Sequence, residues 1–395
     1  MSFIFTDDQM RVLDAFNNGR CLFVSGGAGT GKTTLIREII SNAQADGRRV
    51  AVTASTGIAA SLFSGGRTIH SLLGYHYGYG ANIDEVNFFA KANRLENVDV
   101  LIIDEISMLG RSFVPFLYYC LLYADHPIQL IIVGDFFQLP PVHDDYAFQT
   151  SYWDALKLTP CLLRQVVRQK DEEMVRDINK LKYGDPGCLP YFISRSCTQR
   201  IEQQITICAR KENAQRINQQ ELDWLPGRSY HYSALIDGNV PDFDIPVEQK
   251  LVLKVGARVM ATVNSDEYVN GSLGTVINLE ENEIDVVLDT GVEIRFFRRE
   301  FDSCITGDPV EKTTVRQFPL RLAHAITIHK SQGQTFDSAN IDGSECWAAG
   351  QLYVAVSRVK SIERIHFLSP ISEKNIKTDP SVVRFYQSLP SILHN

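Results

Sequence analysis

VSGGAGTGKTT, residues 24–34, matches the pattern G-x-x-x-x-G-K-[ST] of a phosphate-binding loop. The apolar residues 21–24 before it predict a buried strand, and the apolar spacing of Leu35, Ile36 and Ile39 after it predicts a helix. In this order of strand, turn and helix, backbone N–H groups and the positive end of the helix surround phosphate oxygens. The sequence therefore predicts a nucleotide-binding site.

The residues of this loop have separate predicted roles. Lys32 would reach the β- and γ-phosphates, and the hydroxyl of Thr33 would hold Mg²⁺. We therefore expect ATP and Mg²⁺ as cofactors, bound by Gly26, Gly27, Ala28, Gly29, Thr30, Gly31, Lys32, Thr33 and Thr34.

Two carboxylates follow a third predicted strand, over residues 98–103. In parallel sheets ligands sit at the carboxyl ends of strands. Asp104 would hold Mg²⁺ through water, and Glu105 would orient or deprotonate the attacking water. A fourth predicted strand, over residues 128–133, ends in GDFFQLPP, where Gln138 could contact the γ-phosphate and report its loss to a neighbouring surface.

Composition limits the class of protein. The 395 residues can hold two or three domains, and 44% hydrophobic with 22% charged residues is ordinary for a globular chain. The longest apolar runs have the length of strands, so no membrane association is expected. A helix predicted from Thr6 and a strand from Cys21 leave no room for a leader peptide. The eight cysteines are scattered without a C-x-x-C pair, which favours a reduced, cytoplasmic protein.

The charge distribution is uneven along the chain. The net charge of −8 argues against a nucleic-acid partner, but residues 251–311 contain most of the acidic excess. Residues 312–336 hold Lys312, Arg316, Arg321 and Lys330 and no acidic residue. Such a basic stripe is compatible with a phosphate backbone and equally with a solvated face.

The second half of the chain continues the α/β pattern, with a strand over residues 205–209 and a helix over 211–224. Short strands with turn residues between them then occupy residues 251–297, which predicts a small antiparallel barrel. The α/β pattern returns from residue 320. We therefore predict one domain over residues 1–155, with an aromatic loop inserted at 72–97, and a second over 156–395, with a barrel inserted at about 250–312.

Three features keep two interpretations each. Gln9 lies three residues after Thr6, which suits a helix capping box or an amide that binds adenine. Arg168 and Arg358 could reach the γ-phosphate or form surface ion pairs. The aromatic residues of the loop 72–97 could stack on unpaired bases or fasten the loop to its own domain.

The ordered motifs GGAGTGKTT, VTASTGIAA, TIHS, LIIDEISML, GDFFQLPP, VVRQ, ITIHKSQGQT and LYVAVSR resemble the Pif family of superfamily-one DNA helicases, with RecD and the phage helicase Dda as cousins. The resemblance runs from Gln9 to Arg358. It implies an α/β fold of two RecA-like P-loop domains, with a small aromatic insertion in the first, an SH3-like barrel in the second, and ATP between them.

The resemblance also implies a function. It implies ATP-dependent 5′-to-3′ movement on single-stranded DNA and unwinding of a forked duplex with a 5′ tail, with G-quadruplex DNA as a further candidate substrate. We expect a monomer from a bacterium or a phage-infected cell. The alternative is an ATP-gated clamp or loader on single-stranded DNA that does not separate strands.

Residue roles carried over from the family complete the expected site. The implied catalytic set is Lys32, Asp104, Glu105, Gln138, Arg168 and Arg358, with Gln9 and Gly333 added to the nucleotide-binding residues and Thr33 and Asp104 on the metal. The implied DNA-binding residues are Thr56, Gly57, His70, Pro140, His329 and Ser331.

Overall fold

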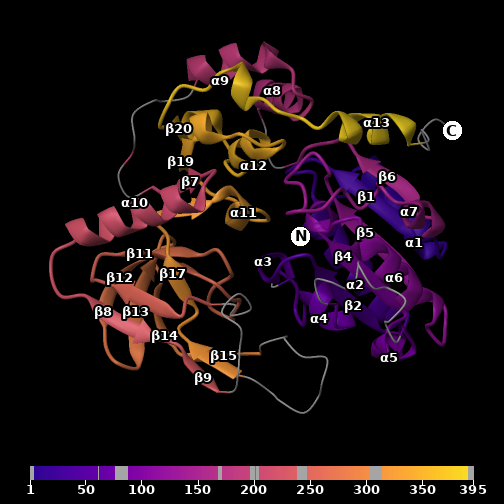
Figure 1. Cartoon of the computed structure of the whole chain (residues 1–395), viewed down its shortest axis with the longest axis horizontal. Coiled ribbons are helices and arrows are strands. Elements are labelled where there is room, and N and C mark those ends of the chain that lie inside the picture. Colours follow the sequence, from indigo (N-terminus) through magenta and orange to yellow (C-terminus); the bar gives the residue numbers. More distant parts are fainter. Residues whose placement is uncertain are drawn as a thin grey trace. The chain divides into compact units, whose positions relative to one another are not determined.

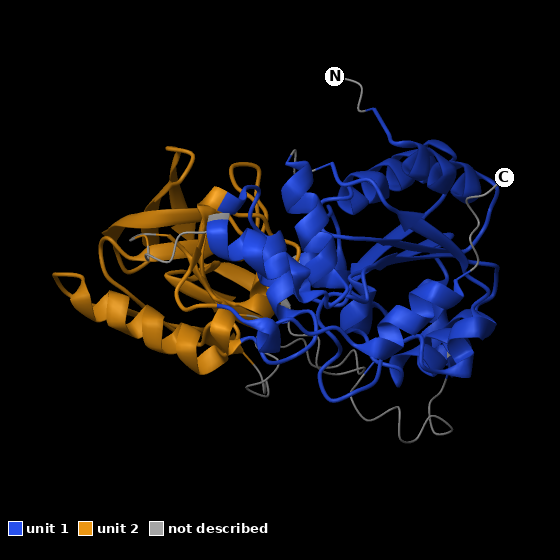
Figure 2. Ribbon diagram, turned by 90° about the horizontal axis from the view of Figure 1, so that it is seen from above, with its two compact units in different colours: residues 1–196, 346–362, 371–395 blue, residues 197–345, 363–370 orange. Residues whose placement is uncertain are grey.

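The computed structural model describes residues 4–60, 62–75, 88–167, 171–195, 201, 204–237, 247–302 and 314–389. Its contacts group the chain into two compact units (Figure 2). Unit 1 contains residues 1–196, 346–362 and 371–395, and unit 2 contains residues 197–345 and 363–370. This grouping follows packing, whereas the predicted boundary between residues 155 and 156 follows the order of the motifs and stays a prediction.

Unit 1 is built on a parallel sheet of six strands in the order β3-β2-β4-β5-β1-β6 (Figure 1). The central strands β1, β4 and β5 are buried along their whole length, as expected for apolar strands covered on both faces. The strands are β1 (Leu22–Gly26), β2 (Val50–Ala54), β3 (Arg67–Thr68), β4 (Val100–Asp104), β5 (Gln129–Gly134) and β6 (Thr159–Leu163).

Several helices of unit 1 begin after a Thr or Asp whose side chain caps the first turn. Thr6 and Gln9 form the predicted capping box of α1. Amphipathic spacing in the sequence predicts that Met10 faces inward, which is wrong: Met10 is 47% exposed, and Val12 is buried instead. The helices are α1 (Asp7–Asn17), α2 (Lys32–Ala45), α3 (Gly57–Ala60), α4 (Ile69–Leu73), α5 (Phe88–Ala92), α6 (Phe113–Leu122), α7 (Ser151–Ala155), α8 (Glu172–Lys182), α9 (Leu189–Arg195), α12 (Gln351–Ser357) and α13 (Pro380–Ser388).

The chain returns to unit 1 near its C-terminal end. An aromatic cluster joins α13 to the first sheet: the ring of Phe385 lies 4.2 Å from that of Phe148, 5.5 Å from that of Phe136 and 5.9 Å from that of Phe23, measured between centroids. The last helix is therefore part of the core around the nucleotide-binding strand.

Unit 2 contains a parallel sheet and an antiparallel region. The parallel sheet has the order β18-β7-β19-β20, and α10 (Lys211–Trp224) and α11 (Ile328–Ser331) belong to the same unit. Its strands are β7 (Thr206–Cys208), β18 (Ala325–Thr327), β19 (Ala339–Asp342) and β20 (Ile365–Phe367).

The antiparallel region contains the short strands predicted over residues 251–297 and extends beyond them on both sides. Its main sheet has the order β14-β13-β12-β11-β17, beside the small sheets β10-β8 and β15-β16-β9, and one apolar cluster runs through it. The strands are β8 (Tyr230–Ser233), β9 (Leu235–Asp237), β10 (Lys250–Leu253), β11 (Arg258–Ala261), β12 (Leu273–Leu279), β13 (Glu283–Leu288), β14 (Glu293–Phe297), β15 (Arg299–Asp302), β16 (Thr314–Gln317) and β17 (Leu320–Leu322).

None of the helices in the described ranges combines the length and the hydropathy that a membrane span requires. Six cysteines fall within these ranges, and all six are free thiols.

The aromatic cluster gives a prediction about stability. Replacing Phe385 with Ala should lower the free energy of unfolding of unit 1 by about 2 kcal/mol, below the range for a fully buried Phe because Phe385 is half-buried. Urea unfolding followed by tryptophan fluorescence measures this change, since Trp153 lies in the same cluster. The matched control is Phe297→Ala, where the side chain is 56% exposed. An equal loss in both variants would contradict a structural role for α13.

Candidate nucleotide-binding site

The loop between β1 and α2 has a backbone that depends on glycine. Gly29 and Gly31 have φ angles of 80° and 82°, in the left-handed region that favours glycine. A Cβ on Gly31 would lie 2.5 Å from Gln9 Nε2. The side chain of Lys32 folds back over the loop, and its ammonium donates to the carbonyl oxygens of Gly26 (2.7 Å) and Gly27 (3.0 Å). The loop therefore holds the ammonium of Lys32 against its own backbone carbonyl oxygens.

Gln9 both caps α1 and contacts this loop. Its Oε1 accepts from the backbone N–H of Thr6 (2.9 Å), while its Nε2 donates to the carbonyl oxygen of Thr30 (3.1 Å). The side chain is fully buried. The capping-box interpretation is confirmed. The contact with adenine stays a prediction, and the position of Gln9 beside the loop is compatible with it.

Asp104 and Glu105 lie at the carboxyl end of β4, both buried. Burial, followed by repulsion from Glu105, raises the pKa of Asp104 to about 7. Glu105 has a φ of 54°, a left-handed conformation that is rare for a non-glycine residue, and its N–H donates to Asp104 Oδ1 (2.8 Å). Such backbone conformations are concentrated at functional sites.

These residues fit a magnesium ion. Glu105 Oε2 is buried and has no hydrogen-bond partner among the described residues, so a carboxylate oxygen is available beside Asp104. A bound divalent cation would favour the ionised form of Asp104. The described ranges contain no cluster of three or more His, Cys, Asp or Glu side chains suited to a metal. Mg²⁺ does not need one, because it is commonly held by one or two protein oxygens with substrate phosphates.

Asp135, which sequence reasoning did not single out, connects three segments of unit 1. Its side chain is fully buried after β5, and its carboxylate lies 3.4 Å from Lys182 Nζ at the end of α8. The hydroxyl of Tyr353 in α12 donates to the same carboxylate (2.9 Å). The signal in the sequence was an Asp directly after the strand-ending glycine of GDFFQLPP.

Two tyrosines continue this network toward the loop. The hydroxyl of Tyr353 also accepts from the backbone N–H of Ala28 (3.1 Å), and burial raises its pKa well above the usual value, so it stays protonated and can donate to Asp135. The hydroxyl of Tyr386 in α13 lies 2.5 Å from Ser25 Oγ and accepts from the N–H of Phe136 (3.1 Å). The C-terminal helices thus contact the nucleotide-binding strand and loop directly.

The structure brings Arg358 to this group. Arg358 follows α12, is 3% exposed, and donates from Nε to the carbonyl oxygen of Val354 (3.1 Å). Desolvation lowers its pKa, and the negative charges of Glu105 and Asp135 act in the opposite direction. The alternative of a surface ion pair is therefore wrong for Arg358. Gln138 is buried three residues after Asp135, and its backbone N–H donates to the carbonyl oxygen of Asp135 (2.9 Å). Arg168 lies outside the described residues.

The candidate DNA-binding residues belong to both units, and except for Pro140 they lie on or directly before short helices. In unit 1, Thr56 Oγ1 accepts from the N–H of Ala59 at the start of α3, where Gly57 also lies. Burial lowers the pKa of His70 to about 4, so this imidazole is neutral at pH 7. Pro140 is half-buried after the turn that follows β5. These observations leave the DNA contacts as predictions.

In unit 2, His329 and Ser331 lie on α11 and Gly333 follows it with a φ of 76°. The hydroxyl of Ser331 is buried and donates to the carbonyl oxygen of Ile328 (2.8 Å), so its described role is local. Neither the strand contact of these residues nor the nucleotide contact of Gly333 is tested by the structure.

The aromatic loop is described at its two ends only. The ring of Tyr75 lies 4.9 Å from that of Phe116, and the ring of Phe88 lies 5.1 Å from that of Tyr119, so both pack on α6. For these two residues the aromatic side chains fasten the loop to its domain. Residues 76–87 lie outside the described part of the chain, and the interpretation as a base-stacking loop stays open there.

Comparisons with known proteins agree with this geometry. The family model of the PIF1-like helicases matches residues 4–180. The chain is 30% identical to the ATP-dependent DNA helicase Pif1 of Bdellovibrio bacteriovorus, over 98% of this chain and 92% of that protein. It is 31% identical to the PIF1 helicase of Xenopus laevis, over 97% of this chain but only 64% of that protein.

Solved structures show the same similarity. The Pif1 helicase of Candida albicans superposes with a TM-score of 0.82 at 28% identity, covering 98% of this chain and all of that one. A Bacteroides Pif1 bound to ssDNA gives a TM-score of 0.75 at 30% identity, covering 98% of this chain and 97% of that one. The predicted fold class, α/β with RecA-like domains, is confirmed.

The Tyr353 network predicts a local change in backbone protection. In Tyr353→Phe the N–H of Ala28 loses its acceptor, so amide hydrogen exchange in residues 26–31 should become faster. Mass spectrometry of peptides from the nucleotide-free protein measures this exchange. Tyr386→Phe is the matched control, because it removes the acceptor of Phe136 and should accelerate exchange there instead. Equal acceleration of residues 26–31 in both variants would show that the loop responds to general loosening and not to this bond.

Proposed function

The chain belongs to the PIF1-like helicase family of ATP-dependent DNA helicases, and on that premise we propose that it uses ATP hydrolysis to move 5′-to-3′ along single-stranded DNA. The observation that carries the proposal is the buried charged group of unit 1. Three members of this group are buried, Asp104, Glu105 and Arg358, and the fourth, Lys32, is half-buried. Their charges interact with one another around the loop. Two cations and two carboxylates in one dry site suit phosphoryl transfer.

Each residue has a chemical task in this proposal. Lys32 would leave the carbonyl oxygens of Gly26 and Gly27 and bind the phosphates, since a phosphate is a stronger acceptor for a buried ammonium. Thr33 and Asp104 would hold Mg²⁺, which neutralises phosphate charge. The unpartnered oxygen of Glu105 would accept the proton of the attacking water.

Arg358 and Gln138 would respond to the γ-phosphate. Arg358 would stabilise the charge that develops on the γ-phosphate, a contribution of roughly 10³–10⁵ in rate where arginine fingers have been measured. Gln138 would report the loss of the γ-phosphate through the turn that begins at Asp135. Gln9 would select adenine. Arg168 and Gly333 keep their family-implied places at the nucleotide as part of the same proposal.

Movement requires that the grip on the strand changes with the nucleotide. We place the strand near Thr56, Gly57, His70 and Pro140 in unit 1, and His329 and Ser331 in unit 2, which are the positions that match the family's motifs. The substrate would be a forked duplex with a 5′ tail, with G-quadruplex DNA as a further candidate. Solved structures of relatives include a Bacteroides Pif1 in complex with ADP-AlF3 and ssDNA. Another concerns DNA unwinding at forked dsDNA by two coordinating Pif1 helicases. The expected monomeric state remains a prediction.

The second candidate is an ATP-gated clamp on single-stranded DNA. It would use the same hydrolytic site but would not separate strands. What favours the motor is the family membership together with candidate strand contacts in both units, since a clamp needs only one such set.

The hydrolytic role of Glu105 gives a direct prediction. Glu105→Gln should lower the rate of ATP hydrolysis by at least about 10²-fold, because the amide cannot accept the proton of the water. Binding of a fluorescent ATP analogue should persist. Phosphate release in the presence of single-stranded DNA measures the rate, and the exposed Glu96→Gln serves as the control. Normal turnover in Glu105→Gln would remove this assignment.

The function is tested with a forked DNA that carries a 5′ tail. With ATP, the wild-type protein should release the labelled strand, and Lys32→Ala should release none. A fork with only a 3′ tail should remain intact, because the strand on which the protein moves is then absent. Hydrolysis stimulated by DNA without strand release would favour the clamp instead.

A further inference from the structure

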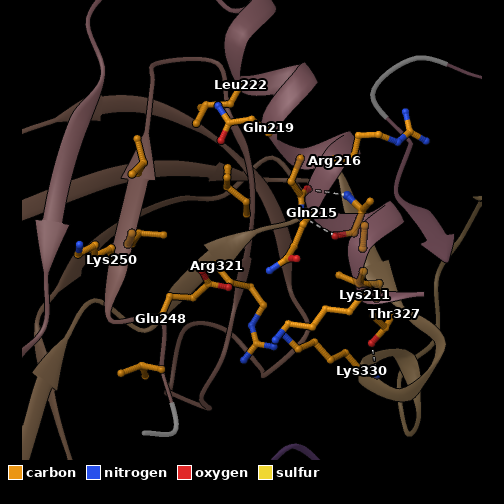
Figure 3. Close-up of a pocket in the computed structure, with 18 residues that line it drawn as sticks. Lys211, Gln215, Arg216, Gln219, Leu222, Glu248, Lys250, Arg321, Thr327 and Lys330 are labelled. Atoms are coloured by element: carbon orange, nitrogen blue, oxygen red, sulfur yellow. Dashed lines mark hydrogen bonds between the residues drawn. The ribbon is translucent and has the colours of Figure 1, made fainter. Parts of the chain in front are cut away.

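A cavity of about 830 Å³ in unit 2 is separate from the nucleotide-binding loop. It lies between α10, the segment from residue 247 to 252, β17 and the residues from β18 to α11. Figure 3 shows Lys211, Arg321 and Lys330 extending from three different elements toward a common point in this cavity. The proposed ATP hydrolysis in unit 1 gives no role to Lys211, Arg321 or Lys330.

Arg321 is the unusual member of the group. Its side chain is 8% exposed, and its Nε has no hydrogen-bond partner among the described residues. No carboxylate of the described ranges forms an ion pair with it. Burying a guanidinium without a hydrogen-bonded partner costs free energy, so proteins normally pair such a group with an anion.

The surroundings of Arg321 add positive charge. Partial desolvation lowers the pKa of Lys330, and the charges of Arg321 and Lys211 lower it further, while Glu248 alone acts in the opposite direction. Arg321 and Lys211 therefore both lie close enough to repel Lys330, and one carboxylate, that of Glu248, lines the same cavity. An anion bound between them would relieve both the repulsion and the unpaired donor of Arg321.

We propose that this cavity binds a phosphate group of the single-stranded nucleic acid, with Arg321 as the buried anchor and Lys211 and Lys330 at the mouth. Phosphate suits the site because a planar guanidinium offers paired donors to its oxygens, while the two ammonium groups act as point charges. The inference deepens the proposed function and rests on it. Two observations favour the strand over a free ion: Lys211 and Lys330 are exposed, and Lys330 lies on α11 between His329 and Ser331.

The test measures how the affinity for DNA depends on salt. Fluorescence anisotropy follows binding of a labelled oligo-dT to the full chain without nucleotide, over a series of salt concentrations. Arg321→Gln should bind roughly tenfold more weakly at low salt, as expected for a lost charge-assisted contact. Its slope of log K against log salt should be smaller by about 0.7, the value for one phosphate contact on a single strand. Lys211→Gln should also have a smaller slope.

The controls separate charge from folding. Arg364→Gln removes one exposed arginine of unit 2 away from the cavity and should keep the wild-type slope. Arg321→Lys keeps the charge and should retain most of the slope. If the role of Arg321 were purely structural, Arg321→Lys would lose as much DNA binding as Arg321→Gln. Lys211 is exposed, so Lys211→Gln tests the cavity without disturbing its buried side.

Three outcomes would overturn the proposal. Wild-type affinity and slope in both Arg321→Gln and Lys211→Gln would remove the cavity from the strand path and leave the helicase function intact. A wild-type protein that does not bind oligo-dT would overturn the proposed function itself. If inorganic phosphate raises the melting temperature of the wild type more than that of Arg321→Gln while DNA binding is unchanged, the cavity takes a free anion and the assignment to the strand is wrong.

Discussion

A fully buried carboxylate, that of Asp135, sets a requirement that the rest of unit 1 meets. A charge removed from water must be paired and hydrogen-bonded, or it destabilises the fold. Its partners come from distant parts of the chain, Lys182 at the end of α8 and Tyr353 in α12. The pairing of this one group therefore holds together segments that lie far apart in the sequence.

The same network joins the nucleotide-binding loop to the C-terminal part of the chain. Tyr353 bonds the backbone of Ala28, and Tyr386 lies against Ser25 and Phe136. Gly350, at the start of α12, leaves no room for a side chain, because a Cβ there would lie 2.5 Å from the carbonyl oxygen of Gln138. The turn that carries Gln138 is thus packed against the helix that precedes Arg358. Under the proposed function, this packing would couple a change at the γ-phosphate to a change in this helix.

Charge is treated differently in the two units. In unit 1 the cations and carboxylates around the loop offset one another, which suits the proposed substrate, a nucleotide that brings its own negative charge and a metal. Five basic residues and one carboxylate, that of Glu248, line the cavity of unit 2, so the imbalance itself favours an anion. The proposed function uses both kinds of site, one to break a phosphate bond and one to hold a phosphate backbone.

The sequence by itself determined the nucleotide-binding loop, the two carboxylates at the end of β4 and the antiparallel region. Each of these depends on residues that are neighbours in the sequence: spaced glycines, acidic residues at a strand end, and turn residues. It also supported the capping box of Gln9, since the two residues of that motif are only three positions apart. Only the tertiary structure decided that Met10 faces solvent, that Asp135 is the centre of a network, that Arg358 is buried near Glu105, and that Arg321 has no described partner. Those facts depend on which distant segments pack together and on how much water they exclude, and neither quantity is encoded in the spacing of residues along the chain.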